Sequence, residues 1–146
     1  MEYVTGYLFD SYLDRVLLIK KNGKAVSTHK DKFHGIGGKV EPKEKPIQAM
    51  RREFKEETGL SISKWNCFGE LHARGDVIYL FSARNEKIVN FKQKTDEEVD
   101  MFNVFSFFKN LLVSYVIVPN TYWMVNMAIV NEMAKNDKQY FKIFEE

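Results

Sequence analysis

Hydrophobic and polar residues form short alternating runs at the start of the chain, and this pattern predicts β-strands. Tyr3–Phe9 and Val16–Lys20 are rich in aromatic and β-branched residues, which favour strands. Asp10–Asp14 supplies the turn between them, and Asn22 with Gly23 signals a second turn before a polar loop. We therefore expect the chain to begin with two strands joined by a tight connection.

After a glycine-rich stretch, apolar residues recur with the spacing of an α-helix. Ile47, Met50 and Phe54 are spaced by three and four residues, which places them on one face of a helix. Gly59 is suited to end that helix, because glycine readily adopts the left-handed conformation of a C-cap. The pattern and its caps predict a helix over about Lys45–Thr58 with a buried apolar face.

The second half of the chain begins with a predicted hairpin. Trp65–Ala73 and Val77–Ala83 have the composition of strands, and Arg74–Asp76 between them indicates a tight turn. Arg84–Glu98 is polar and is predicted to be a loop that could hold a short strand. Val99–Phe108 is strongly apolar, and its pattern fits a helix and a strand equally well.

A second helical period occupies Thr121–Ala134, after a short apolar segment that ends at Pro119. Tyr140–Phe144 is predicted to be a last edge strand. The side of the helix expected to face the core carries Val125, Ala128, Ile129 and Met133.

The order of these elements indicates an α+β sandwich, because strands stand before and after a central helix and a second helix follows near the end. A chain of 146 residues is long enough to bury one core, so we expect a single domain over residues 1–146. The many aromatic residues support a folded core.

Composition excludes several classes of partner. The formal net charge of +2 implies no strong attraction to nucleic acid polymers or membranes, and no apolar run is long enough to span a bilayer. The one cysteine, Cys67, cannot form an internal disulfide, and the N-terminus lacks a signal pattern, so we expect a cytoplasmic protein. The sequence leaves open whether it is a monomer or a homodimer.

The predicted central helix carries the most informative chemistry. Glu53, Glu56 and Glu57 stand at positions i, i+3 and i+4 and therefore share one face. Such close carboxylates repel one another and raise each other's pKa unless a cation lies among them. Their hard oxygen atoms suit Mg²⁺, or Mn²⁺, better than zinc. A solvated charged helix face is the alternative interpretation.

Other residues of the same stretch suit an anionic ligand. The glycines that precede the helix let the backbone turn tightly and approach a ligand closely. Pro46 fits the first turn, and Glu44 just ahead of it suits the positive end of the helix dipole. Arg52 precedes Glu56 by four residues, so it can pair with that carboxylate and orient it.

Taken together, this stretch resembles the Nudix box, the motif G-x5-E-x7-R-E-U-x-E-E-x-G-U of the Nudix hydrolase family, in which U is a bulky apolar residue. The resemblance implies a mixed sheet between helices in an α/β/α sandwich, with the box as a loop-helix-loop motif. The matching residues are Gly38, Glu44, Arg52, Glu53, Phe54, Glu56, Glu57, Gly59 and Leu60.

The resemblance also implies an activity, the metal-dependent hydrolysis of a nucleoside diphosphate linked to another group. Glu53, Glu56 and Glu57 would hold the metal, with the backbone carbonyl of Gly38 as a further ligand. Either Glu56 or Glu57 would be the general base, and the sequence does not choose between them. Arg52 would orient these carboxylates rather than bind phosphate.

The resemblance to the Nudix hydrolase family also implies two further contacts with the metal or the substrate. An additional acidic ligand often comes from a later loop in this family, and Glu97, Glu98 and Asp100 are the candidates, of which Glu98 is selected. A charged solvated loop is the alternative for this segment. Lys39 is a candidate phosphate contact, with a solvated loop lysine as the alternative.

Two segments resemble the MutT-like branch that hydrolyses 8-oxo-dGTP. KFHGIGGKV is similar to its lead into the box, with His34 where asparagine is common, and VPNTYWMV is similar to its base-pocket segment. Asn120 would then read a purine edge with its amide, although an N-cap role after Pro119 is an equal alternative. Further candidates for the base pocket are Phe33, Trp123, Lys21 and Thr5, with core packing the alternative for Trp123.

The expected function is therefore the Mg²⁺-dependent conversion of a purine nucleoside triphosphate, oxidised or not, to nucleoside monophosphate and pyrophosphate. Hydrolysis of ADP-ribose or of another nucleotide-sugar diphosphate is the alternative enzymatic activity. A domain of this family that senses a nucleotide without cleaving it is the alternative outside enzymology. Such sensors usually lack some of the carboxylates of the box, and this chain has all of them.

Overall fold

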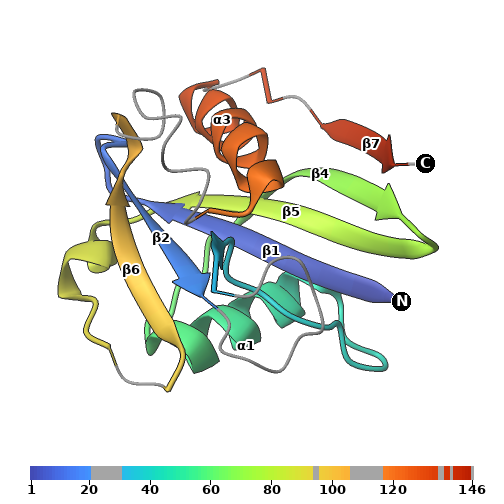
Figure 1. Ribbon diagram of the computed structural model, residues 1–146, viewed down its shortest axis with the longest axis horizontal. Helices are drawn as coiled ribbons and strands as arrows, with labels where there is room; N and C mark the ends of the chain where they lie inside the picture. Colours follow the sequence, from blue (N-terminus) through green and yellow to red (C-terminus); the bar gives the residue numbers. More distant parts are fainter. Residues whose placement is uncertain (21–30, 94–95, 106–116, 135–136, 139, 146) are drawn as a thin grey trace.

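The computed structural model describes residues 1–20, 31–93, 96–105, 117–134, 137–138 and 140–145. Its strands form one mixed seven-stranded sheet, with helices α1 and α3 on opposite faces (Figure 1). The predicted α/β/α sandwich is therefore confirmed. The elements are β1 Glu2–Phe9, β2 Arg15–Lys20, β3 Phe33–His34, α1 Pro46–Thr58, β4 Asn66–Ala73, β5 Asp76–Arg84, the 3₁₀ helix η1 Glu86–Asn90, β6 Glu98–Asn103, α3 Pro119–Met133 and β7 Phe141–Glu145.

The strands follow the order β3-β2-β1-β5-β4-β7, and β6 pairs with β2. β1 pairs in parallel with β5 along its whole length, and the second half of β4 pairs in parallel with β7. The hairpin of β4 and β5, and the pairs that β2 makes with β1, β3 and β6, are antiparallel. Two parallel pairs within a mainly antiparallel sheet require helical crossovers, and helices accordingly cover both faces.

Apolar side chains point alternately to the two faces of the strands and so form two cores, one on each side of the sheet. In β2, Leu17 and Ile19 pack with the cluster that contains α1, whereas Val16 and Leu18 pack with the cluster that contains α3. Successive side chains of a strand point to opposite faces, so both sides of this strand are apolar because both are covered by a helix.

Helix α1 forms where the sequence predicts it. Pro46 occupies its first turn, and Gly59 ends it at φ 73°, where its N–H donates to the Lys55 carbonyl over 2.8 Å. Met50 and Phe54 are fully buried against the sheet. Burial of each such side chain contributes about 1.5–3 kcal/mol, which fixes this face of the helix inward and turns its charged face outward.

A glycine-rich segment connects β3 to α1 and lies along β1. Ile36 exchanges two main-chain hydrogen bonds with Gly6, and the Gly38 carbonyl accepts the Val4 N–H over 2.9 Å. A Cβ atom on Gly37 would lie 1.9 Å from the Val4 carbonyl oxygen, so this close pairing requires glycine there. The segment thus carries the start of the motif to a fixed place beside β1.

Several predicted boundaries differ from the structure. The stretch predicted as a loop contains η1, which forms because the Asn85 side chain accepts the Lys87 N–H over 2.9 Å and Ile88 is buried. The ambiguous apolar segment is strand β6 up to Asn103, within the described residues. Trp65 precedes β4 and is held by its indole N–H, which donates to the Ile62 carbonyl over 3.1 Å.

Helix α3 begins at Pro119, two residues before the predicted start. Val125 and Ala128 are buried as expected, whereas Met133 is exposed, because it lies in the last turn of the helix. No helix of the described residues is long and apolar enough to cross a membrane.

The predicted last strand is β7, and a polar cluster fixes it to β4. Glu70 of β4 accepts from the Lys142 ammonium over 2.8 Å and from the Tyr140 hydroxyl over 3.1 Å, and His72 Nε2 lies 3.0 Å from the same carboxylate. The contacts with Lys142 and His72 lower the pKa of Glu70 to about 2. Glu70 is therefore an ionised link between the two strands.

We expect Glu70→Gln to flatten the acid limb of the stability curve. The folded-state pKa of about 2 lies below the ordinary value of 4.5, so the stabilisation is complete above 4.5 and is lost as pH falls from there toward 2. Melting temperatures of wild type and variant between pH 2 and 7 should converge at the acid end and separate at neutral pH. Lys142→Met should give a smaller effect, because His72 and Tyr140 remain, and parallel curves for Glu70→Gln would contradict the assignment.

Candidate active site

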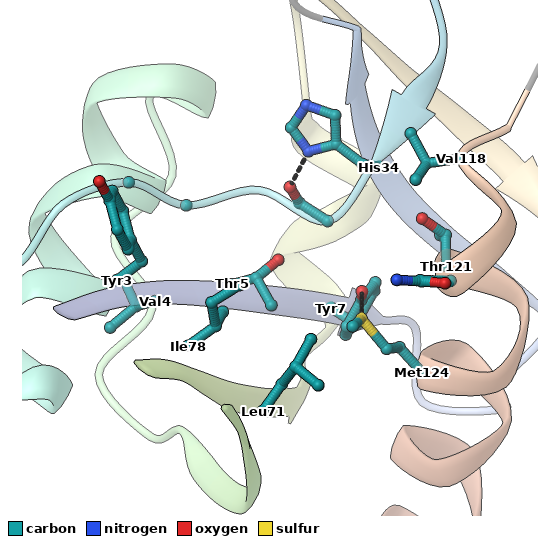
Figure 2. A pocket seen from close by; sticks show the side chains of 14 residues that line it. Tyr3, Val4, Thr5, Tyr7, His34, Leu71, Ile78, Val118, Thr121 and Met124 are labelled. Carbon is teal, nitrogen blue, oxygen red and sulfur yellow. Dashed lines mark hydrogen bonds between the residues drawn. The ribbon is translucent and has the colours of Figure 1, made fainter. Parts of the chain in front are cut away.

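A cleft of about 270 Å³ opens between β1, the glycine-rich segment and the N-terminus of α3 (Figure 2). It brings together parts of the chain that are far apart in sequence, including Thr5, His34 and Asn120, which were predicted as base-pocket residues, and Gly38 of the motif. The lining residues are Tyr3, Val4, Thr5, Tyr7, His34, Gly35, Gly37, Gly38, Leu71, Ile78, Val118, Asn120, Thr121 and Met124.

Arg52 organises the charged face of α1 next to this cleft. Its Nε and Nη2 atoms donate to the two oxygens of Glu44 over 3.0 and 2.9 Å, and its Nη1 donates to Glu53 over 2.7 Å. Nη1 also reaches Glu56 Oε2 at 3.4 Å, and Nη2 donates to the Lys39 carbonyl over 3.0 Å. One guanidinium therefore joins the loop ahead of the helix to two of the predicted carboxylates.

These hydrogen bonds favour the charged forms of both Arg52 and Glu44. Hydrogen bonding to Glu44, and then to Glu53, raises the pKa of Arg52, and the same hydrogen bond lowers the pKa of Glu44. Glu44 stands just ahead of the first turn, as predicted, and it also forms a bidentate ion pair with Arg52. The predicted pairing of Arg52 with Glu56 is present, but it is the longest of these contacts.

Gly38 lies directly against the carboxylate of Glu53. A Cβ atom at position 38 would stand 2.4 Å from that carboxylate, so glycine leaves the space that the carboxylate fills. Glu56 is exposed and Glu57 is half-buried on the same helix face. Oxygen donors on adjacent turns, next to a backbone carbonyl, suit a hard divalent cation by their chemistry.

The carboxylates of Glu53, Glu56 and Glu57 do not converge on one point in this structure. Among the described residues, no three His, Cys, Asp or Glu side chains lie close enough together to enclose an ion. The Nη1 atom of Arg52 contacts one oxygen of Glu53 and one of Glu56, and its positive charge offsets the repulsion between them. Binding of a cation by all three glutamates would therefore require their side chains to rotate toward one another.

In the structure, Glu98, the predicted additional metal ligand, and Lys39, the predicted phosphate contact, each contact another residue. Glu98 lies in β6 rather than in a loop, where it pairs with the Lys20 ammonium at 2.5 Å and raises the pKa of that lysine. Asp100 lies in the same strand, and its burial, together with the nearby charge of Glu98, raises its pKa. Lys39 contributes its backbone carbonyl to Arg52.

Asn120 lines the cleft, and it is not the N-cap of α3. The N-cap of α3 is Val118, and Asn120 stands inside the first turn. Its Nδ2 atom donates to Glu145 Oε1 of β7 over 3.1 Å. Because an ionised carboxylate only accepts hydrogen bonds, this contact sets the orientation of the amide.

The other predicted base-pocket residues separate into two groups. Thr5 and His34 line the cleft, and His34 Nδ1 donates to the Gly35 carbonyl over 2.7 Å, which leaves Nε2 as the acceptor of the neutral ring (Figure 2). Phe33 and Trp123 instead pack in the core on the α3 face, as the alternative for Trp123 expected. Lys21 lies outside the described residues.

Sequence analysis missed two residues that line the cleft, Tyr7 and Met124. Tyr7 and Met124 both line it and contact each other, with the Tyr7 hydroxyl 3.1 Å from Met124 Sδ. The signal for Tyr7 was available, because Thr5 and Tyr7 alternate on one face of the same strand. Met124 could not be found this way, since only the packing of α3 against β1 brings it there.

Comparison with known proteins places the chain in a family. The family model described as the NUDIX domain matches residues 3–112, which include the whole motif and exclude α3 and β7. No match was found among curated proteins. The family match therefore rests on the same residues that carry the sequence resemblance.

Solved structures named as MutT proteins have the same fold. The protein from Methanosarcina mazei Go1 has a TM-score of 0.70 at 16% identity, covering 92% of this chain and 96% of that one. The protein from Bacillus halodurans has a TM-score of 0.66 at 14% identity, with 98% and 88% covered. A structure from the study of MutT from Aliivibrio salmonicida and Vibrio cholerae has a TM-score of 0.64 at 18% identity, with 88% and 95% covered.

We expect Arg52→Lys to destabilise the protein by about 1–3 kcal/mol, because an ammonium cannot replace the planar fork that joins Glu44, Glu53 and Lys39. Urea unfolding should show a lower midpoint with an unchanged slope. Arg51→Lys is the matched control, since its described hydrogen bond is a single exposed one to Ser63, and it should change stability by less than about 0.5 kcal/mol. Equal losses in the two variants would contradict the organising role of Arg52.

Proposed function

The chain belongs to the NUDIX family of hydrolases, and from this premise we propose that it hydrolyses purine nucleoside triphosphates to nucleoside monophosphate and pyrophosphate. One observation carries the proposal, the double role of Gly38. This residue lines the cleft and also touches the carboxylate of Glu53. A ligand in the cleft would therefore extend its phosphates directly onto the charged face of α1.

The substrate chemistry explains why acidic residues are needed at a site for an anion. A triphosphate repels an attacking nucleophile, so its charge has to be neutralised before water can attack. We propose that Glu53, Glu56 and Glu57, with the Gly38 carbonyl, hold Mg²⁺ or Mn²⁺. When bound, the ion would neutralise phosphate charge and make the attacking water more acidic. The Gly38 carbonyl keeps a second lone pair for this role beside its hydrogen bond from Val4.

The residues of the chain have distinct roles in this proposal. Glu56 or Glu57 removes the proton from the attacking water, and both are accessible enough on the helix face to do so. Arg52 keeps Glu53 and Glu56 in place through its hydrogen bonds and balances their repulsion before a cation arrives. Glu98 is a further ligand candidate that would have to leave Lys20 first.

The base side of the cleft supports a purine ligand. Asn120, Thr5 and His34 supply polar groups among apolar walls, which is the usual composition of a nucleotide-binding pocket. Since Glu145 holds the Asn120 amide nitrogen, the amide oxygen is available to accept from an N–H group of a base. We propose a guanine-type base, oxidised or not, as the group that Asn120 reads.

The function can be tested by product analysis. Purified protein is incubated with 8-oxo-dGTP, dGTP, dATP and ADP-ribose, with Mg²⁺ and with excess EDTA. We expect pyrophosphate and monophosphate from the guanine triphosphates with Mg²⁺, and no turnover with EDTA. Exclusive cleavage of ADP-ribose would replace this proposal by the nucleotide-sugar activity, and full turnover in EDTA would remove the metal from it.

We expect Glu56→Gln and Glu57→Gln each to lower kcat by about 10²-fold or more while leaving the melting temperature nearly unchanged. The amide keeps the shape of the side chain but loses its charge and basicity. Glu86→Gln is a matched control on η1, where the carboxylate accepts the Ser11 N–H over 2.8 Å away from the cleft. If both α1 variants kept wild-type rates, the carboxylates would be a solvated helix face.

A further inference from the structure

The floor of the cleft carries a buried hydroxyl that the proposed function does not use. Tyr7 lies on β1 with its side chain 1% exposed, and it reaches the cleft beside Met124 of α3 (Figure 2). Burial raises the pKa of Tyr7 far above its ordinary value, against a smaller opposing effect of a hydrogen bond with Thr5. The phenol is therefore protonated at neutral pH and is a hydrogen-bond donor.

The partner of this donor is a weak one. The Tyr7 hydroxyl lies 3.1 Å from Met124 Sδ, and a thioether sulfur is a poor acceptor compared with a carbonyl oxygen. The same hydroxyl also has a side-chain hydrogen bond with Thr5, whose effect on the pKa of Tyr7 is smaller than that of burial. Buried polar groups in proteins are usually well satisfied, so a hydroxyl that donates to sulfur at the wall of a cleft is an unusual feature.

The backbone leaves room for this hydroxyl pair only because residue 35 is glycine. A Cβ atom there would lie 2.3 Å from Thr5 Oγ1 and 2.9 Å from the Tyr7 Cζ atom that bears the hydroxyl. The Gly35 carbonyl is turned to His34, which donates to it. In the contacts described, the Tyr7 hydroxyl thus has only neutral side-chain partners, the Met124 sulfur and the Thr5 hydroxyl.

We propose that Tyr7 is a specificity-determining residue whose hydroxyl donates to a carbonyl oxygen on the base of the bound nucleotide. Met124 Sδ accepts from this hydroxyl in the structure, and a ligand oxygen would take its place as the stronger acceptor. This inference rests on the proposed function, since it assigns a further reader to the same site. Asn120 accepts from a base N–H and Tyr7 donates to a base carbonyl.

The two proposed hydrogen bonds, from the base to Asn120 and from Tyr7 to the base, determine which bases are preferred. Guanine and 8-oxoguanine offer both an N–H group and a carbonyl oxygen, whereas adenine offers no carbonyl. Adenine offers only ring nitrogens as acceptors, so it cannot form the hydrogen bond from Tyr7 to a base carbonyl. Tyr7 therefore favours bases with a carbonyl group over adenine.

The test compares Tyr7→Phe with wild type, using dissociation constants of GMP and AMP from calorimetry. We expect binding of GMP to weaken about tenfold, the effect of one hydrogen bond, and binding of AMP to change less than about twofold. Tyr79→Phe is the matched control, because its hydroxyl donates to Glu2 over 2.8 Å outside the cleft lining, and it should leave both constants unchanged.

Met124→Leu gives a second measurement that does not depend on the folding of Tyr7→Phe. It conserves volume but removes the competing sulfur acceptor, so GMP should bind about two- to threefold more tightly relative to AMP. Equal changes for GMP and AMP in both variants, or none, would overturn the role of Tyr7 while leaving the hydrolase proposal intact. A wild-type protein that cleaves and binds no purine nucleotide would instead overturn the proposed function and this inference with it.

Discussion

Main-chain pairing between the glycine-rich segment and β1 positions both halves of the candidate site. The hydrogen bonds from Val4 and Gly6 to residues 36 and 38 hold this segment in the opening where β1 and β2 diverge, since those strands pair only at Phe9 and Val16. Any side chain at position 37 would collide with the backbone of β1. Because of this contact, Gly38 stands against the carboxylate of Glu53 while the preceding residues form a wall of the cleft.

The charged face of α1 depends in turn on Arg52. Several carboxylates on adjacent turns repel one another, and a helix with this face uncompensated would be destabilised. The guanidinium offsets that repulsion and ties Glu44, ahead of the helix, to Glu53 within it. The arrangement is therefore preorganised by a cation belonging to the chain, and in the proposed metal complex its carboxylates would have to exchange this partner for another.

The parts of the fold that were predictable from sequence are those set by local rules. Pro46, Gly59 and the spacing of Met50 and Phe54 determine α1, and composition determines most strands. Contacts between distant residues were not predictable, because periodicity says nothing about which elements meet. The pairing of Glu44 with Arg52 crosses the start of the helix, and that of Asn120 with Glu145 depends on the docking of β7. For the same reason Phe33 appeared to be a base-pocket residue and is a core residue.

Successive side chains of strand β1 point to opposite faces of the sheet, and the two faces have different neighbours. A Cβ atom on Gly6 would lie 2.6 Å from Met50 of α1, whereas Thr5 and Tyr7 on the other face line the cleft. Successive positions of one strand thus meet different packing constraints, one set by the helix that carries the carboxylates and the other by the shape of the cleft. Substitutions at every second residue of β1 could therefore reshape the cleft without altering the packing of α1 on the opposite face.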